Sequence, residues 1–390
     1  MKLKILILVI LSSPYIHAQA YKKIHSKAVL VDTHNDILMK AVDNGMVFDQ
    51  DLRGKTHSDL ARWKQGGLDV QLFSVFCDGD KKNPYQYANR QMDTLDAVAA
   101  RNPDKIMKAY NMNEIMTIVK QHKIAALFGV EGGHMIEDDI DKLDSLFKRG
   151  TRYMTLTWNN STSWATSAAD ETSGQNLIHP GLTELGKNIV HRMNKLGMIV
   201  DISHVGQQTF WDVIQTTSKP IMASHSSVYQ LCPHRRNLKD DQIKAIAKNG
   251  GVIQINFNPG FIDSTYGNKE NSFFQKHAVE KDSLKKMGVD DWHVEEYLYS
   301  AYKNEIDMAR PALSILITHI DYIRKLVGVD YIGLGSDFDG ITVTPMQLED
   351  VTTYPLITKA LLDKGYTEKD ITKILGGNFL RVLKANELPQ

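Results

Sequence analysis

The chain is poor in several features that mark specialised proteins. It has only two cysteines in 390 residues, which excludes a small fold held together by many disulfides. It carries 46 basic and 46 acidic residues, so it lacks the positive excess typical of nucleic-acid binding, and we expect no nucleic-acid partner. It also lacks internal repeats and low-complexity tracts. With 42% hydrophobic and 24% charged residues, it is long enough to bury one large core.

The N-terminus has the features of a secretory signal. Lys2 and Lys4 precede an apolar run at residues 5–11, and Ala18-Gln-Ala20 offers the small residues that a signal peptidase needs. The run is too short to cross, as a helix, a hydrocarbon layer of about 30 Å. We therefore expect residues 1–20 to be a cleaved signal peptide rather than an anchor.

The remaining residues, 21–390, contain no recognisable linker and are expected to form a single domain in the periplasm or outside the cell. No cysteine stands at the cleavage point and the C-terminal residues 386–390 are polar, so we expect no membrane anchor. Two alternatives stay open for Cys77 and Cys232. They form a disulfide, as an exported protein permits, or they are two buried thiols.

Short apolar segments rich in β-branched residues recur eight times, as expected for buried parallel strands. Most of the stretches between them have helical patterns, clearest at 183–196 and 240–248. Strand and helix alternating eight times predicts an α/β fold, a (β/α)8 TIM-type barrel, although an open doubly wound sheet would alternate similarly. A helical excursion is expected between the seventh and eighth strands, within residues 261–312, including a helix near 291–302. The predicted strands are residues 28–34, 68–76, 124–131, 152–158, 197–204, 220–225, 250–257 and 331–337.

Metal-binding side chains stand at the ends of four of these segments. His34 and Asp36 follow the first, Glu131 ends the third, and His204 and His225 end the fifth and sixth. The carboxyl ends of barrel strands meet at one face, where barrel enzymes carry their chemistry. Five ligands are too few for two separate four-coordinate sites. If Glu131 and a hydroxide both bridge, each of two ions has four ligands, which predicts a two-metal centre.

Two further polar residues suit catalysis beside such a centre. Asp337, which ends the eighth segment, is not needed as a ligand and is expected to accept the proton of the attacking water and return it to the leaving group. Arg236, in the loop after the sixth strand, is suited to a substrate carboxylate or an oxyanion, because its planar fork matches two oxygens.

Each motif taken alone has a structural interpretation. A His after an apolar run is more often a hydrogen-bonded core residue, and a single His-x-Asp pair arises by chance in a chain with 14 histidines. The common position of five such residues at strand ends favours the metal centre. The remaining histidines considered lie on loops or helix faces and are interpreted as structural or surface residues: His57, His122, His179, His191, His234, His277 and His293.

Six ordered motifs resemble those of the membrane (renal-type) dipeptidase family, among the amidohydrolase-type metal-dependent hydrolases. The resemblance extends from about residue 24 to about residue 385. It implies a (β/α)8 barrel with two Zn²⁺ ions, hydrolysis of dipeptides that often carry a C-terminal D-residue, and a homodimer. It also implies metal binding by the five ligands above, with Glu131 bridging, and substrate contacts by Arg236 and Asp337. The motifs are 32–36, 131–134, 201–204, 224–227, 235–237 and 335–340.

One position departs from the pattern of this family. Where animal members have a His thought to bind the oxyanion, this chain has Trp158, which donates one N–H and cannot carry a positive charge. Either Trp158 or Arg236 takes that role, or the substrate is placed differently. The disulfide and lipid anchor of animal relatives have no counterpart here.

The expected function is therefore that of an exported zinc dipeptidase that acts on free dipeptides by means of the bridging hydroxide. Two alternatives stay open. The first is hydrolysis of another amide or an ester, such as an N-acyl-D-amino acid or a lactone, at the same centre. The second is a binding protein that keeps the metals without turnover.

Overall fold

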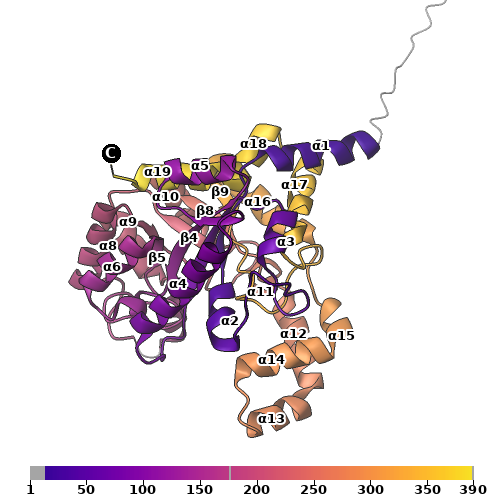
Figure 1. Ribbon diagram of the computed structural model, residues 1–390. Helices are drawn as coiled ribbons and strands as arrows, with labels where there is room; N and C mark the ends of the chain where they lie inside the picture. Colours follow the sequence, from indigo (N-terminus) through magenta and orange to yellow (C-terminus); the bar gives the residue numbers. More distant parts are fainter. Residues whose placement is uncertain (1–13, 175–176, 389–390) are drawn as a thin grey trace, which may run out of the picture.

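The computed structural model describes residues 14–174 and 177–388 (Figure 1). Most of the expected signal peptide, residues 1–13, lies outside the described residues. Helix α1 (Pro14–Lys27) includes its last residues and continues beyond the expected cleavage point. Near the end of α1, buried His25 contacts Thr358 Oγ1 at 2.8 Å and the carbonyl oxygen of Gly66 at 2.9 Å, which attaches the helix to the domain.

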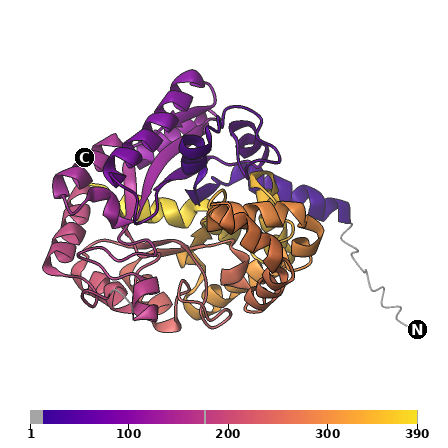
Figure 2. The ribbon, with the colours of Figure 1, turned by 90° about the horizontal axis from the view of Figure 1, so that it is seen from below.

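Eight parallel strands form a nearly closed barrel, as predicted (Figure 2). The first and last strands meet where Asp36 N–H donates to the Phe338 carbonyl at 2.9 Å and Asp337 N–H donates to the His34 carbonyl at 3.1 Å. Each predicted segment overlaps one strand. In barrel order the strands are β1 (Val31–Asn35), β2 (Val70–Phe76), β4 (Ile124–Glu131), β5 (Thr151–Thr155), β6 (Ile199–Asp201), β7 (Met222–Ser226), β8 (Val252–Ile255) and β9 (Ile332–Leu334). Three of the strands, β1, β5 and β7, extend one residue beyond the predicted bounds.

One short strand that the sequence pattern does not predict lies outside this ring. β3 (Ile106–Lys108) pairs in parallel with β4 alone and takes no part in closing the barrel. It has three residues, too few to show an alternating pattern, and only Ile106 of the three is buried.

Helices surround the barrel and also close one end of it. The two helices predicted most clearly, at 183–196 and 240–248, are confirmed as α8 and α10. Thr183 caps α8 at its N-terminus, and Gly197 and Gly250, with φ of +83° and +80°, terminate α8 and α10. The last helix, α19, packs against the beginnings of the strands and lies opposite the excursion in Figure 1. The helices are α2 (Ile37–Asn44), α3 (Leu60–Gln65), α4 (Pro84–Arg101), α5 (Met112–Lys120), α6 (Ile140–Arg149), α7 (Ala168–Ser173), α8 (Glu184–Leu196), α9 (Gln207–Thr216), α10 (Asp240–Asn249), α16 (Leu313–Val327), α17 (Tyr354–Asp363), α18 (Glu368–Thr372) and α19 (Asn378–Asn386).

The expected excursion between the seventh and eighth barrel strands is helical throughout most of its length and projects on the same side as α2 (Figure 1). It has a small apolar core of its own, which includes Phe273 and Leu298. An ion pair between Lys40 on α2 and Glu296, at 3.4 Å, links it to the barrel. Its helices are α11 (Pro259–Ile262), α12 (Tyr266–Lys276), α13 (Ala278–Lys286), α14 (Asp291–Ala301) and α15 (Lys303–Asp307).

Two further expectations concern covalent links and membrane spans. Cys77 and Cys232 are both buried free thiols, so the disulfide alternative is wrong. Within residues 14–174 and 177–388, every helix is too short or too polar to span a membrane.

Candidate metal centre and catalytic cavity

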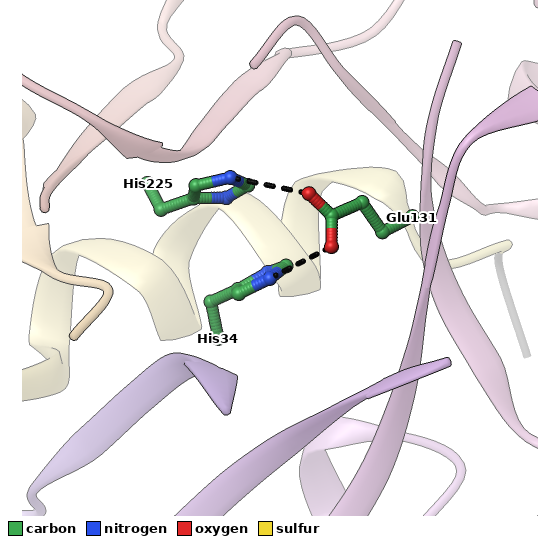
Figure 3. A group of neighbouring side chains, drawn as sticks. All are labelled: His34, Glu131 and His225. Carbon is green, nitrogen blue, oxygen red and sulfur yellow. Dashed lines mark ion pairs between the residues drawn. The ribbon is translucent and has the colours of Figure 1, made fainter. Parts of the chain in front are cut away.

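The five predicted ligands converge at the carboxyl ends of the barrel strands, and none is more than 8% exposed. Glu131 lies at the centre of the group (Figure 3). Its Oε2 is 3.2 Å from His34 Nε2, whereas its Oε1 is 2.8 Å from His204 Nε2 and 3.4 Å from His225 Nε2. Asp36 Oδ2 lies 3.4 Å from His34 Nε2. The two carboxylate oxygens thus face different imidazoles, as a bridging ligand requires.

The electrostatics of the group show a need for added positive charge. His34 Nε2 and both carboxylate oxygens of Asp36 are buried without a hydrogen-bond partner. Burial raises the pKa of Asp36. Burial also disfavours a charged His34, but its electrostatic interactions with Tyr153, Asp36 and Glu131 outweigh it and raise the His34 pKa well above its usual value. A divalent cation would supply the charge that these buried acidic groups favour, so the residues fit a metal centre.

The other two imidazoles are held in the form that binds metals. Burial lowers the pKa of His204 to about 3 and that of His225 well below its usual range, so both are neutral at pH 7. A metal binds the neutral imidazole. Two groups of residues each bring their donor atoms within 4.8 Å of one another. One group contains His34, Glu131 and His225, and the other contains His34, Asp36 and Asp337. Asp337 therefore lies beside the predicted ligands, as its predicted role requires.

Two buried aspartates form hydrogen bonds that hold together the strand ends beside the candidate ligands. Asp201 Oδ1 accepts from the backbone N–H of Ser203 and of Ser224, at 3.1 and 2.8 Å, and its Oδ2 accepts from the Ser224 hydroxyl at 2.6 Å. Asp32 in β1 makes the same pattern with Ser336, which follows β9: its Oδ1 accepts the Ser336 N–H at 2.9 Å and its Oδ2 the hydroxyl at 2.6 Å. Each aspartate thereby joins two neighbouring strands beside a candidate ligand.

Two functional candidates adopt a backbone conformation that is uncommon for residues with a side chain. His204 has φ of +65° and Asp337 has φ of +64°, both in the left-handed region. Such strain is retained where the surrounding structure enforces it, often at functional sites. Each position lies three residues beyond the end of a barrel strand, β6 or β9, and both side chains line the cavity beside Glu131.

A cavity of about 710 Å³ opens above the ligands. Arg236 lines it and is 5% exposed; its Nη2 donates to the His225 carbonyl at 3.4 Å, but its Nε and Nη1 have no partner. Burial lowers the pKa of Arg236 to about 10, so it is still charged at pH 7. A buried cation with free donors on a cavity wall suits an anionic ligand group.

Asp337 also lines the cavity. Its Oδ1 is 3.9 Å from His34 Nε2, and its Oδ2 accepts from Asn256 Nδ2 at 2.9 Å. Burial, reinforced by the charges of Asp36 and Glu131, raises the pKa of Asp337 to about 7. A carboxyl group with this pKa can accept and release protons near neutral pH. Asn256 has no role in the sequence analysis, because nothing in its local pattern points to Asp337.

Aromatic and imidazole rings form other parts of the cavity wall. Trp158 lies with its ring centroid 5.0 Å from that of Phe76 and 6.4 Å from that of His204. Phe76 pairs with Glu131 across neighbouring strands. His234 and His293 also line the cavity, so the interpretation of these two as merely structural or surface residues is incomplete. The segment that carries His293 reaches the cavity only through the path of the excursion, which its sequence does not reveal.

Comparisons with known proteins identify the family of the chain. The model of the membrane dipeptidase family, peptidase family M19, matches residues 18–390. An uncharacterised dipeptidase of Schizosaccharomyces pombe is 34% identical over 392 residues, covering 95% of this chain and 83% of that protein.

Solved structures support the fold. The probable dipeptidase PvdM of Pseudomonas aeruginosa has a TM-score of 0.78 at 23% identity, covering 96% of this chain and 99% of that one. A metallopeptidase of Rhodobacter sphaeroides, liganded with a phosphinate mimic of L-Ala-D-Ala, has a TM-score of 0.74 at 21% identity, covering 92% and 99%. The chain belongs to the membrane dipeptidase family and is a metal-dependent dipeptidase, a hydrolase of peptide bonds.

Proposed function

We propose that this protein is an exported, zinc-dependent dipeptidase that hydrolyses free dipeptides of the L-Xaa-L-Xaa and L-Xaa-D-Xaa types. The observation that carries the proposal is the position of Glu131, whose two oxygens face different imidazoles beneath one cavity. In this proposal His34, Asp36 and Glu131 hold one Zn²⁺, and His204, His225 and Glu131 hold the other. Three or four His and carboxylate ligands are typical of zinc.

The cavity supports recognition of both charged ends of a dipeptide. The unpaired Nε and Nη1 of Arg236 are suited to the terminal carboxylate, and Asp337 is suited to the amino group. Because both ends are bound, longer peptides would fit poorly. The ligand of the Rhodobacter sphaeroides metallopeptidase mimics L-Ala-D-Ala, which supports the inclusion of a D-residue at the second position.

The metal ions, when bound, supply the charge that makes water a nucleophile near neutral pH and polarises the scissile carbonyl. Asp337 accepts the proton that the attacking water loses and donates it to the departing amine. Asn256 holds one oxygen of Asp337 by its hydrogen bond, which leaves the other directed toward His34. Trp158 Nε1 or Arg236 stabilises the negative charge that develops on the carbonyl oxygen.

A substrate panel tests the proposal. Purified protein loaded with Zn²⁺ is assayed with L,L- and L,D-dipeptides, tripeptides, N-acyl-D-amino acids and lactones. We expect turnover of dipeptides of both types and little turnover of the others. Preferential turnover of N-acyl-D-amino acids or lactones would reassign the substrate, and two bound ions without any hydrolysis would favour a binding protein.

The signal sequence supports export, and the proposed mature enzyme is an unanchored homodimer, as the family resemblance implies. N-terminal sequencing of the protein recovered from the periplasm or medium should begin near Tyr21. Sedimentation of that protein should give twice the mass of one chain, and a monomer would contradict the dimer.

A further inference from the structure

The three imidazoles that face Glu131 differ in what contacts their other ring nitrogen. His225 Nδ1 is 2.7 Å from the Ser224 hydroxyl, and His34 Nδ1 is 2.9 Å from the Tyr153 hydroxyl. His204 Nδ1 is buried and has no partner. A metal-binding imidazole needs its proton on the nitrogen that faces away from the metal, so these contacts bear directly on metal binding.

The Ser224 hydroxyl has one proton, and its surroundings decide where that proton lies. Asp201 Oδ2 is 2.6 Å away and also accepts from Thr155 Oγ1 at 2.5 Å. If Ser224 donated to His225 instead, its oxygen would face a buried carboxylate oxygen at 2.6 Å with no proton between them, which is strongly unfavourable. Ser224 therefore donates to Asp201 and accepts from His225 Nδ1–H. The Nε2 lone pair of His225 is then left facing Glu131.

Tyr153 acts in the same way on His34. Its hydroxyl donates to the Thr33 carbonyl at 3.0 Å, so it accepts from His34 Nδ1–H. Tyr153 is fully buried, with an exposed fraction of 0%. Since a carbonyl oxygen only accepts, the Thr33 carbonyl in β1 sets the direction of both hydrogen bonds of the Tyr153 hydroxyl.

We propose that Asp201 with Ser224, and Tyr153 with the Thr33 carbonyl, are positioning groups that keep a proton on Nδ1 of His225 and of His34 before any metal binds. None of them lines the cavity. His204 has no such group and serves as an internal comparison. The inference relies on the metal assignment above, but it concerns where the protons lie in the metal-free chain, so it can be tested separately.

The first test uses metal-free protein in which only histidine carries ¹⁵N. Long-range ¹H–¹⁵N spectra report which ring nitrogen carries the proton, and His→Gln variants assign the signals. We expect Nδ1–H for His225 and a protonated Nδ1 for His34. An unprotonated Nδ1 at His225 would overturn the proposal, whatever the protein hydrolyses.

The second test measures affinity for Zn²⁺ by competition with a chromophoric chelator. Ser224→Ala removes one hydroxyl from a buried strand residue and should weaken Zn²⁺ binding about 10- to 100-fold, the usual cost of losing an outer partner of a ligand. Ser224→Thr keeps a hydroxyl and should restore part of that affinity. Tyr153→Phe should have an effect of the same kind.

Ser226→Ala is the matched control, because Ser226 lies in the same strand, is buried, and bonds to the Ser203 hydroxyl at 3.3 Å. It should bind Zn²⁺ as the unaltered chain does. Wild-type affinity in folded Ser224→Ala protein would contradict the proposal. If that variant does not fold, the spectra of the unaltered chain still decide. If the unaltered chain binds no Zn²⁺, the proposed function fails, and the spectra again test the proton positions independently.

Discussion

Asn256 donates a hydrogen bond of 2.9 Å to Asp337, so one carboxylate oxygen of Asp337 is fixed while the other lies 3.9 Å from His34 Nε2. A carboxyl group held in this way, with its pKa raised to about 7, is placed to exchange protons beside the metal ligands. This relationship links the end of β9 to the loop after β8 at the mouth of the barrel.

Replacing Asp337 by Asn should reduce kcat by about 10² or more, because the amide cannot accept the proton of the attacking water. The replacement keeps the shape of the side chain, so metal content should change little. Steady-state kinetics and elemental analysis of the same preparation check both statements. Near-normal turnover with both ions bound would refute the role assigned to Asp337.

Replacing Arg236 by Lys should raise KM for dipeptides about 10- to 100-fold, because the single ammonium cannot reproduce a paired contact with a carboxylate. A dipeptide amide lacks that carboxylate and should show little difference between the two proteins. Arg235 also lines the cavity but is exposed, so Arg235→Lys is the matched control and should be nearly neutral. An equal rise in KM for the amide would count against carboxylate binding by Arg236.

Trp158→Phe keeps an apolar ring beside Phe76 but removes the N–H. If Trp158 stabilises the oxyanion, the loss of one donor should lower kcat about 10²-fold with little effect on KM, and this is the result we expect. Rates with an L,L- and an L,D-dipeptide measure it. Unchanged kcat with both substrates would assign the oxyanion to Arg236 instead.

The stability of the fold should depend on His319, which lies on α16 away from the metal ligands. Its Nδ1 accepts from Val228 N–H at 3.1 Å and its Nε2 contacts the Ile262 carbonyl at 2.9 Å, so the ring is neutral and fully buried. Burial lowers its pKa from 6.5 to about 4. The unfolded chain thus takes up this proton at higher pH than the folded chain. The contribution of neutral His319 to the free energy of unfolding is complete above pH 6.5 and is lost as the pH falls toward 4.

The shift corresponds to about 3 kcal/mol in the free energy of unfolding. His319→Gln should therefore show a weaker loss of stability than the unaltered chain when denaturant unfolding is compared at about pH 7 and about pH 5. Exposed His191 on α8 provides the control, since His191→Gln should leave the pH dependence unchanged. Parallel pH profiles for the unaltered chain and His319→Gln would rule out this contribution.

The barrel and the five candidate ligands could be predicted from the sequence because each depends on local order. A buried parallel strand is a short apolar run, and a ligand at its carboxyl end comes next in the chain. What depends on contacts between distant segments could not be predicted. Tyr153 meets His34, and Asn256 meets Asp337, only after the barrel closes.

Two other features were hidden for different reasons. Asp201 and Ser224 stand within motifs that the resemblance covers, but their hydrogen bond depends on the pairing of β6 with β7. His234 and His293 sit in polar segments without apolar periodicity, and only the folded paths of the β7 loop and the excursion bring them to the cavity.

The number and position of bound ions test the central claim most directly, because every assigned role depends on Glu131 holding two of them. Anomalous scattering from crystals of metal-replete protein should show two ions, one beside each oxygen of Glu131, about 3.5 to 4 Å apart. Elemental analysis should give two ions per chain and a loss at both positions in Glu131→Gln. A single ion in the unaltered chain, or loss of only one in the variant, would contradict the account.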